Sequence, residues 1–246
     1  MEPLFQVVYS IGIFSCALSS AMIAVDRECD LFGVVFIAFC NTFGGGALRD
    51  LFLGISPPMM FWQESIFDLL LCTGVALSVF LFAALMQKTF LRYEKTIARV
   101  NNVTDALGVG AFAVYGTQVA LKYGFTKPIV AIAMGLVTGI VGGIIRDLCL
   151  NDVPFVLRKR VYALAALAGA VVYYILTVSF ILPSIIPTVV GVLTTFGLRI
   201  LATIFKWNFP VAIRFSKLAE QGNTAPRRRP PVVPIRKPRK RHGKRK

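Results

Sequence analysis

Thr42-Phe43-Gly44-Gly45-Gly46-Ala47-Leu48-Arg49-Asp50-Leu51-Phe52-Leu53 is a glycine cluster followed by Arg-Asp, set inside a strongly apolar stretch. A similar segment, Gly139-Ile140-Val141-Gly142-Gly143-Ile144-Ile145-Arg146-Asp147-Leu148-Cys149-Leu150, lies 97 positions later in a second apolar stretch. Residues 41–57 and 138–154 share seven identical residues out of 17 without a gap. The match indicates a duplicated unit. Glycines and charges inside membrane-length helices are typical of a polar pathway, so the repeat is the first candidate for function.

The composition is that of an integral membrane protein. Of the 246 residues, 56% are hydrophobic and 16% are charged, whereas a soluble domain carries about 25% charged residues. A membrane-crossing helix needs about 20 apolar residues. Seven such stretches are present, at residues 4–25, 31–54, 65–86, 103–122, 128–150, 161–181 and 185–206. The short connections leave no room for a soluble catalytic domain, so we expect no enzymatic activity.

The basic residues predict the orientation of the chain. They gather between the third and fourth stretches, between the fifth and sixth, and after the seventh, at Lys88, Arg92, Lys95, Arg99, Arg158, Lys159, Arg160 and from Arg227 onward. Seven crossings put these three groups on one side of the membrane, which the positive-inside rule assigns to the cytoplasm. We therefore expect a protein of the cell (inner) membrane with its N-terminus outside and its C-terminus in the cytoplasm.

The repeat divides the chain into four parts. Residues 1–100 hold the first three-helix repeat, residues 101–183 the second, residues 184–210 a seventh transmembrane helix and residues 211–246 a basic tail. Because each unit crosses the membrane three times, the second copy must insert upside down. We predict an all-α integral membrane fold of seven transmembrane helices, with two inverted three-helix repeats related by a pseudo-two-fold axis in the membrane plane.

The tail from Pro226 to Lys246 is rich in proline and in basic residues and cannot bury a core, so we expect it to be disordered. One interpretation is a solvated tail that fixes topology. The other is attraction to anionic lipid headgroups, worth on the order of 1 kcal/mol for each basic residue near the surface. The tail has no aromatic residues among its charges, and the net charge of +15 arises mostly there and in the loops. We therefore expect no nucleic-acid partner.

The glycine clusters allow two interpretations. Three consecutive glycines, Gly44 to Gly46, cost roughly 1 kcal/mol each relative to alanine in a helix. They either let two helices approach closely, with nearby hydroxyls bonding back to their own helix, or they let each helix unwind. In the second case, freed carbonyls and the preceding polar side chains would replace part of a cation's hydration shell. The candidate pathway residues are Thr42, Gly44, Gly45, Gly46, Thr138, Gly142 and Gly143, with Asn41 beside them.

Arg49 and Arg146 follow the glycines by about one turn, and each precedes an aspartate. Adjacent residues point about 100° apart around a helix, so we expect each arginine to find its partner across the bundle. The candidate partners are Asp50, Asp147, Asp68 and Asp105. The alternative is that the arginines extend from helix ends to the membrane surface. Arginines that face a central path would tune or gate it.

The cysteines and the histidine do not indicate metal chemistry. Cys16, Cys29, Cys40, Cys72 and Cys149 are scattered without the spacing of a metal site, and we interpret them as buried structural thiols. The single histidine, His242, lies in the tail. We therefore expect neither a metal nor a cofactor.

The segments Gly44-Gly45-Gly46-Ala47-Leu48-Arg49-Asp50 and Gly142-Gly143-Ile144-Ile145-Arg146-Asp147, with Val153-Pro154-Phe155-Val156-Leu157-Arg158 and Tyr162-Ala163 after them, resemble a known family. It is the bacterial branch of the trimeric intracellular cation (TRIC) channel family, whose duplicated domain is also labelled a glycine-transporter domain. The resemblance covers about residues 5–207. It implies a homotrimer of seven-helix protomers, each with its own pore for monovalent cations, chiefly potassium, lined by kinked second and fifth helices.

By position, the resemblance puts the kinks at the two glycine clusters and the pore-side basic residues at Arg49 and Arg146. The chain departs from the family pattern at Tyr9, which stands where many relatives have an aspartate matching Asp105. We therefore expect a homotrimeric potassium channel. The alternative is a secondary transporter for glycine or another small zwitterion, in which two broken helices offer opposite dipole ends to the substrate. A third hypothesis is a scaffold whose basic tail binds anionic lipid or ribosomes.

Overall fold

The computed structural model describes residues 3–56, 66–158 and 161–207. These residues belong to one compact unit within Met1–Phe209. Three sequence features lie outside the described residues: Pro57, the last residue of the first repeat segment; the basic residues Lys159 and Arg160; and the tail of residues 211–246.

The described part of the chain is helical and contains no strand. Its elements are α1 (Pro3–Asp26), α2 (Leu31–Phe52), α4 (Ile66–Leu85), α5 (Gln87–Arg92), α6 (Glu94–Lys122), α7 (Pro128–Cys149), α8 (Phe155–Arg158), α9 (Val161–Tyr174), the π-helical turn η1 (Ile175–Ser179) and α10 (Ile185–Ile204).

Within the two repeats, the helices α1, α2, α6 and α7 are each followed by a residue with left-handed backbone. These residues are Glu28, Gly54, Gly124 and Asn151, with φ of 57°, 67°, 83° and 56°. The next amide donates to a carbonyl five residues earlier, as in the Schellman motif. The bonds are Cys29 N to Ala24 O (3.0 Å), Ile55 N to Asp50 O (2.9 Å), Phe125 N to Ala120 O (3.0 Å) and Asp152 N to Asp147 O (2.8 Å). Glu28 and Gly124 are 96 positions apart and Gly54 and Asn151 are 97 apart, so the repeat extends to the helix ends.

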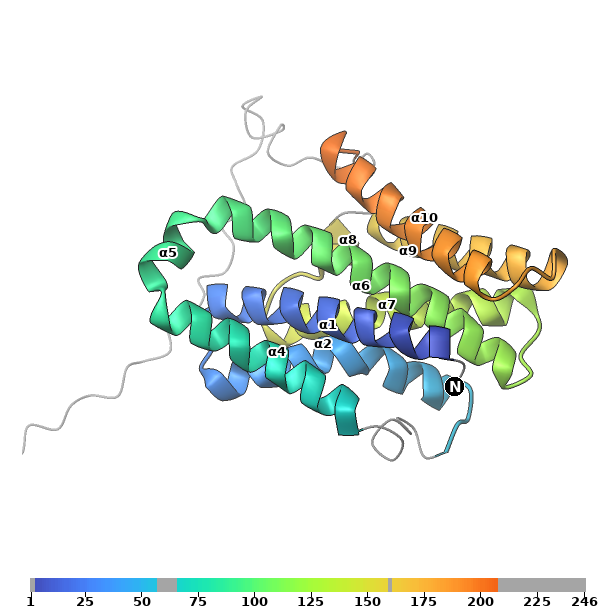
Figure 1. Ribbon diagram of the computed structural model, residues 1–246, viewed down its shortest axis with the longest axis horizontal. Helices are drawn as coiled ribbons and strands as arrows, with labels where there is room; N and C mark the ends of the chain where they lie inside the picture. Colours follow the sequence, from blue (N-terminus) through green and yellow to red (C-terminus); the bar gives the residue numbers. More distant parts are fainter. Residues whose placement is uncertain (1–2, 57–65, 159–160, 208–246) are drawn as a thin grey trace, which may run out of the picture. The chain divides into compact units, whose positions relative to one another are not determined.

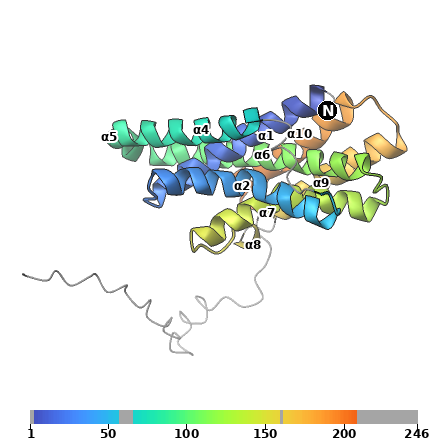
Figure 2. The ribbon, with the colours of Figure 1, turned by 90° about the horizontal axis from the view of Figure 1, so that it is seen from below.

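The helix α6 is the centre of the packing. It contacts α1, α7, α9 and α10, while α2 packs on α1, α4 and α7. Figures 1 and 2 both show α6 running among these helices, and Figure 1 shows α4 and α10 on opposite sides of them. This arrangement surrounds α6 with protein over much of its length.

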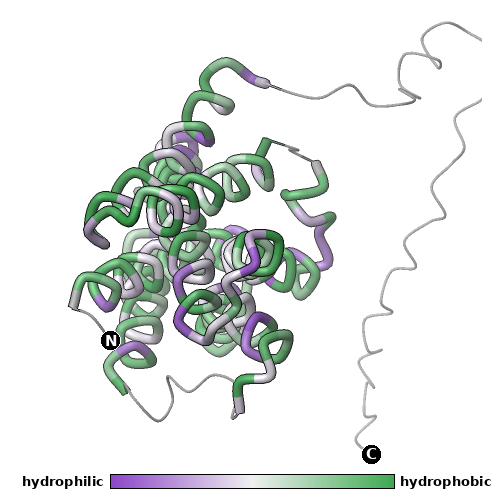
Figure 3. The backbone as a smooth tube through the Cα atoms, turned by 90° about the vertical axis from the view of Figure 1, so that its right-hand side faces the viewer, coloured by the Kyte–Doolittle hydropathy of each residue, from purple (hydrophilic) through white to green (hydrophobic). Residues whose placement is uncertain are grey.

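Six helical stretches are long and apolar enough to cross a membrane. They are Leu4–Asp26, Leu31–Phe52, Ile66–Leu85, Pro128–Cys149, Val161–Ser179 and Ile185–Ile204, and they match six of the seven predicted spans. Figure 3 shows hydrophobic residues over much of the helical bundle. The predicted span at residues 103–122 falls in α6, which is long enough at 29 residues but more polar than the others. A helix packed against protein on several sides has less need of an apolar surface for lipid.

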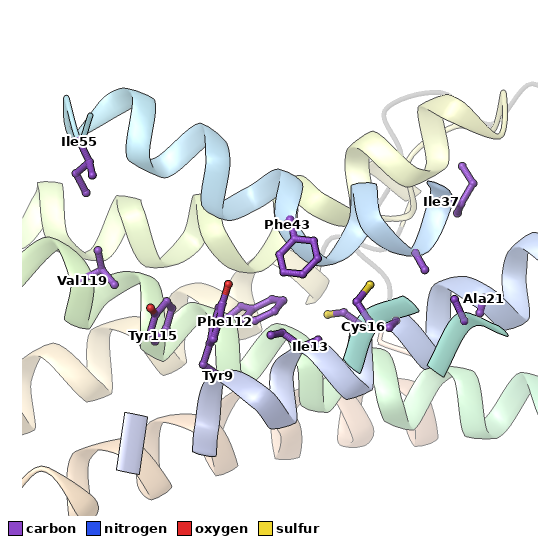
Figure 4. Close-up of a cluster of buried hydrophobic side chains, with 14 of the residues drawn as sticks. Tyr9, Ile13, Cys16, Ala21, Ile37, Phe43, Ile55, Phe112, Tyr115 and Val119 are labelled. Atoms are coloured by element: carbon purple, nitrogen blue, oxygen red, sulfur yellow. The ribbon is translucent and has the colours of Figure 1, made fainter. Parts of the chain in front are cut away.

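The largest core cluster lies between α1, α2 and α6. Figure 4 shows Tyr9 and Ile13 of α1 facing Phe43 of α2, with Phe112 and Tyr115 of α6 beside them. The Tyr9 and Tyr115 rings stack with their centres 4.5 Å apart. This core holds together the helices that carry the repeated glycine segments.

Small residues allow close approach elsewhere in the bundle. A Cβ on Gly169 of α9 would meet the side chain of Thr195 and lie 2.7 Å from the carbonyl oxygen of Gly191, both on α10. A Cβ on Gly197, also on α10, would meet nothing within 4 Å. The two glycines therefore differ in packing although they belong to the same pair of helices.

We expect Gly169→Ala to destabilise the protein by about 1–3 kcal/mol, because the added methyl group overpacks the contact between α9 and α10. The control is Gly197→Ala, which should be neutral or gain up to about 1 kcal/mol from helix propensity. The measurement is the apparent melting temperature in detergent, followed by loss of the monodisperse peak. Equal melting temperatures for the two variants would contradict the described packing of α9 on α10.

Candidate functional site: a helix crossing between two charge clusters

The two glycine segments meet where α2 crosses α7. A Cβ on Gly45 would lie against the carbonyl oxygen of Thr138, and a Cβ on Gly142 against the carbonyl oxygen of Asn41, closer than real Cβ atoms approach. Gly142 is the repeat equivalent of Gly45, and Thr138 is that of Asn41. The same contact thus occurs twice: a glycine of α2 lies against a carbonyl of α7, and the equivalent glycine of α7 lies against the equivalent carbonyl of α2. Asn41 contacts Gly142 and the later residue Gly45 contacts the earlier residue Thr138, so α2 and α7 are antiparallel at the crossing.

Both helices remain α-helical through the crossing, α2 over Leu31–Phe52 and α7 over Pro128–Cys149. Local unwinding at the glycines, one of the two expected uses, is therefore wrong for this structure. The missing side chains let the backbones approach while each helix continues. Figure 4 shows the axis of α2 changing direction beside Phe43, so the bend lies within an unbroken helix.

The second glycine of each pair lies beneath an arginine. A Cβ on Gly46 would lie 3.8 Å from Arg49 Nη2, and a Cβ on Gly143 would lie 3.8 Å from Arg146 Nη2. Each guanidinium folds back over the glycine three residues earlier. In the pattern Gly-Gly-x-x-Arg, the first glycine serves the helix crossing and the second lies in contact distance of the arginine.

Each arginine binds the aspartate that follows it. Arg49 Nε and Nη2 donate to Asp50 Oδ1 at 2.8 and 2.7 Å. Arg146 Nε and Nη2 reach Asp147 Oδ1 at 2.9 and 2.8 Å. The expectation that adjacent residues do not pair is wrong here, because the long arginine side chain curls around the helix to its neighbour. Arg49 and Arg146 are only 7% and 3% exposed, so neither extends to the membrane surface.

Asp105 of α6 joins Arg146 to a further arginine. Its Oδ1 accepts from Arg146 Nη1 at 3.3 Å, and its Oδ2 accepts from Arg199 Nη2 at 2.7 Å. Arg199 lies on α10, and its guanidinium carbon is 4.0 Å from the centre of the Tyr162 ring on α9, a cation–π contact. We call Asp105, Arg146, Asp147, Tyr162 and Arg199 the second cluster. It connects α6, α7, α9 and α10.

The first cluster consists of Arg49, Asp50, Tyr9 and Tyr115. The guanidinium carbon of Arg49 lies 5.5 Å from the centre of the Tyr115 ring. Arg49 Nη1 is buried and has no hydrogen-bond partner within the described residues. Asp68, another predicted partner, is buried near the start of α4 at 4% exposure. The first cluster therefore surrounds its Arg–Asp pair with two tyrosine rings, whereas the second adds a carboxylate, an arginine and one tyrosine ring to its pair.

The polar residues at the crossing are all buried and hydrogen-bonded. Their bonds are Thr138 Oγ1 to Met134 O (2.7 Å), Asn41 Nδ2 to Cys16 O (3.2 Å) and Cys72 Sγ to Thr42 Oγ1 (3.7 Å). The Thr138 hydroxyl thus donates to its own helix. Asn41 and Thr42 instead connect α2 to α1 and α4. The predicted pathway residues therefore lie together around one crossing.

The cysteines differ more in burial than their sequence context predicted. All five are free thiols, and Cys16 and Cys72 are buried. Cys149, the last residue of α7, is exposed, so the interpretation of all five as buried thiols is wrong at this position. The end of α7 carries it out of the helix packing.

Arg199 is the one charged residue of the two clusters that was not among the predicted charged site residues. The available signal was a lone arginine in the apolar stretch 185–206, since an ionisable residue inside a span usually has a buried partner. Its partner, Asp105, lies 94 positions away in sequence, a pairing that neither periodicity nor local spacing indicates.

These features define a polytopic helical membrane protein, built from a duplicated unit, with ion-pair clusters beside a central helix crossing. A family model described as "Glycine transporter" matches the chain twice, over residues 6–84 and 102–178. The chain belongs to this family and is a bacterial member of the TRIC family, as the resemblance implied.

The relatives support this assignment over most of the chain. The membrane protein YvgT of Bacillus subtilis is 35% identical over 169 residues, which covers 68% of this chain and 79% of YvgT. The inner membrane protein YadS of Escherichia coli is 29% identical over 198 residues, which covers 80% of this chain and 90% of YadS.

Two solved structures share the fold. The TRIC trimeric intracellular cation channel orthologue from Rhodobacter sphaeroides is 33% identical, with a TM-score of 0.73, covering 84% of this chain and 100% of its own. A prokaryotic TRIC channel in 0.5 M KCl is 31% identical, with a TM-score of 0.74, covering 85% of this chain and 100% of its own. The described structure and these proteins therefore have the same helical architecture.

We expect Asp105→Asn to destabilise the protein by about 3–5 kcal/mol, because it leaves two buried arginines without the carboxylate they share. The matched control is Asp152→Asn, which breaks the half-exposed ion pair between Arg27 and Asp152 (2.5 Å). Breaking such a pair should cost at most about 1 kcal/mol. Melting in detergent compares the variants, and a larger loss for Asp152→Asn would refute the bracing role of Asp105.

Proposed function

We propose that this protein is a potassium-permeable cation channel that assembles as a homotrimer, with one pathway in each protomer beside the α2–α7 crossing. The observation that carries the proposal is the reciprocal crossing of the two glycine segments, flanked by buried arginine–aspartate clusters. The Rhodobacter sphaeroides TRIC trimeric intracellular cation channel orthologue is 33% identical and is covered over all of its chain. This likeness supports the cation as the permeating species and the trimer as the assembly.

The reciprocal contacts support an inverted repeat. When residue A of one copy touches residue B of the other, and the equivalent of B touches the equivalent of A, a two-fold axis passes between the contacts. Gly45 with Thr138 and Gly142 with Asn41 meet this condition. The two copies would then enter the membrane from opposite faces, as in transporters built from inverted repeats.

The two clusters would lie at opposite ends of the pathway. Arg49 follows its crossing glycine by four residues on α2, and Arg146 does the same on the antiparallel α7. The two crossing glycines are themselves four residues apart along the antiparallel pair, because Gly45 lies level with Thr138 and Gly142 with Asn41. The arginines are therefore twelve residues apart along the helix axis, or about 18 Å at a rise of 1.5 Å per residue. A cation would enter past one cluster, pass Asn41, Thr42 and Thr138, and leave past the other.

At the crossing itself the two backbones touch, which suits a closed pathway. Opening would require α2 and α7 to separate or bend at their glycines. The energy for partial dehydration of the cation would come from buried polar side chains and carboxylates. The residues proposed for the pathway are Thr42, Gly44, Gly45, Gly46, Thr138, Gly142 and Gly143, and those proposed for electrostatic control are Arg49, Asp50, Asp105, Arg146 and Asp147.

We further propose that α6 is the seventh span. Its length of 29 residues exceeds the roughly 20 needed to cross the membrane, and its polar residues would be shielded by neighbouring helices. Seven crossings would place the N-terminus outside and the basic C-terminal tail in the cytoplasm, within reach of anionic lipid headgroups.

A carrier for glycine or another zwitterion is less well supported. That alternative needed two broken helices with free ends near the middle of the membrane, so that opposite dipole ends could hold the substrate. Because α2 and α7 are continuous helices, they offer no such ends at the crossing.

The double variant Gly45→Ala with Gly142→Ala should lower potassium conductance about tenfold or more, because each methyl group stiffens its helix by roughly 1 kcal/mol and displaces the partner backbone. The measurement is single-channel recording in planar bilayers. The matched control is Gly74→Ala on α4, where an added Cβ would meet nothing within 4 Å.

Stepwise potassium currents from the wild-type protein support a channel. Saturable uptake of labelled glycine without any current would overturn it in favour of the carrier. Wild-type conductance in the double variant, with the protein still monodisperse, would reduce the glycines to packing devices.

Reporter fusions should place the two ends of α6 on opposite sides of the membrane, because α6 crosses it. Fusions after residue 92 should be fluorescent with green fluorescent protein, and fusions after residue 125 should be active with alkaline phosphatase. A full-length fusion at the C-terminus provides the cytoplasmic control. The same reporter being active at both ends of α6 would rule out a seventh span.

A further inference from the structure

The two repeat arginines have the same local geometry. Arg49 and Arg146 each bind the next aspartate through Nε and Nη2, and each folds over the glycine three residues earlier. Each also follows a crossing glycine by four residues. A functional difference between them must therefore come from the surrounding helices.

Arg146 is held from two helices. Its Nε and Nη2 bind Asp147 on its own helix, and its Nη1 binds Asp105 on α6 at 3.3 Å. Asp105 is itself held by Arg199 at 2.7 Å, and Asp147 Oδ2 accepts from the Phe155 amide at 2.7 Å. Moving Arg146 would disturb a network that reaches α8 and α10.

Within the described residues, the side-chain hydrogen bonds of Arg49 all go to its own helix. Both of its hydrogen bonds go to a single oxygen, Asp50 Oδ1, and its buried Nη1 has no hydrogen-bond partner within the described residues. Its contact with α6 is the face of Tyr115 at 5.5 Å. A cation–π contact is much weaker than a bond between buried charges, so Arg49 can leave its position at lower cost than Arg146.

An exchange of residues between the copies accounts for this difference. The second family match begins 96 residues after the first and ends 94 residues after it. With these offsets, Tyr9 aligns with Asp105, and Asp68 aligns with Tyr162. The carboxylate that braces Arg146 from the neighbouring helix is therefore a tyrosine in the first copy.

We propose that Arg49 is the mobile charge that controls access at its end of the pathway, whereas Arg146 is a fixed brace. The inference rests on the proposed channel function. While Arg49 binds Asp50, the pair is neutral and cations can pass. When the guanidinium leaves Asp50, its positive charge enters the path and repels cations, which closes that end.

The test records potassium currents in planar bilayers and melting temperatures in detergent for single variants of the full chain. Arg49→Gln removes the mobile charge and should raise the open probability about fivefold, the effect of a charge barrier near 1 kcal/mol in a water-like environment. Arg146→Gln should lower the melting temperature more than Arg49→Gln does, because it breaks the bond to Asp105. Arg27→Gln removes an arginine that lies outside both clusters, so it should leave the open probability at the wild-type value. Arg49→Lys keeps the charge but loses the two-nitrogen bond to Asp50, so the charge should enter the path more often and lower the open probability below the wild-type value.

A second variant tests the proposal even if Arg49→Gln does not fold. Tyr9→Asp gives Arg49 the neighbouring carboxylate that Arg146 has, so it should hold the arginine in place and raise the open probability as well. Unchanged open probability in both Arg49→Gln and Tyr9→Asp, or an equal rise in Arg27→Gln, overturns the proposal. A wild-type protein that passes no current at all would instead refute the channel function on which the proposal rests.

Discussion

The contact between the backbones of α2 and α7 is the constraint on which the rest of the site depends. Lipid gives helices no hydrophobic reason to associate, so their packing must come from close van der Waals contact, which small residues permit. Gly45 and Gly142 provide that contact twice, each against a carbonyl oxygen of the other helix. Because each arginine lies four residues beyond its crossing glycine, the position of the crossing also fixes where the charges lie.

Charges this deeply buried need partners, and the clusters show how the protein supplies them. Removing an ion from water costs several kcal/mol even after relaxation, which an adjacent opposite charge offsets only when the geometry is good. Arg146, Arg199, Asp105 and Asp147 form a group with two charges of each sign, so the second cluster is neutral as a whole. A neutral, hydrogen-bonded group can remain inside a membrane bundle where a single arginine could not.

Much of this structure could be predicted from the sequence because it follows from local chemistry. Six predicted spans appear as apolar helices, and Gly54, Gly124 and Asn151 are typical residues for the helix ends they form. The pairing of each arginine with its neighbour could not be predicted from helix geometry alone, because it depends on the flexibility of a long side chain. The bond between Arg199 and Asp105 could not be predicted either, because only tertiary packing brings α10 to α6. The helices also stay continuous at the glycines because a packing partner, and not water, occupies the space.

The odd number of long helices explains why the two copies cannot be equivalent. Each copy of the repeat contributes three helices, and α10 has no counterpart among the described residues. It packs on α6 and α9, both in the second copy, and brings Arg199 to Asp105. A second positive charge there makes a carboxylate favourable at position 105, because that carboxylate then serves two arginines. No additional arginine reaches the first cluster in the described residues, where Tyr9 fills the corresponding position with an aromatic ring. The duplicated halves thus keep one backbone plan, while the extra helix gives the second half an ion pair that the first half lacks in the described residues.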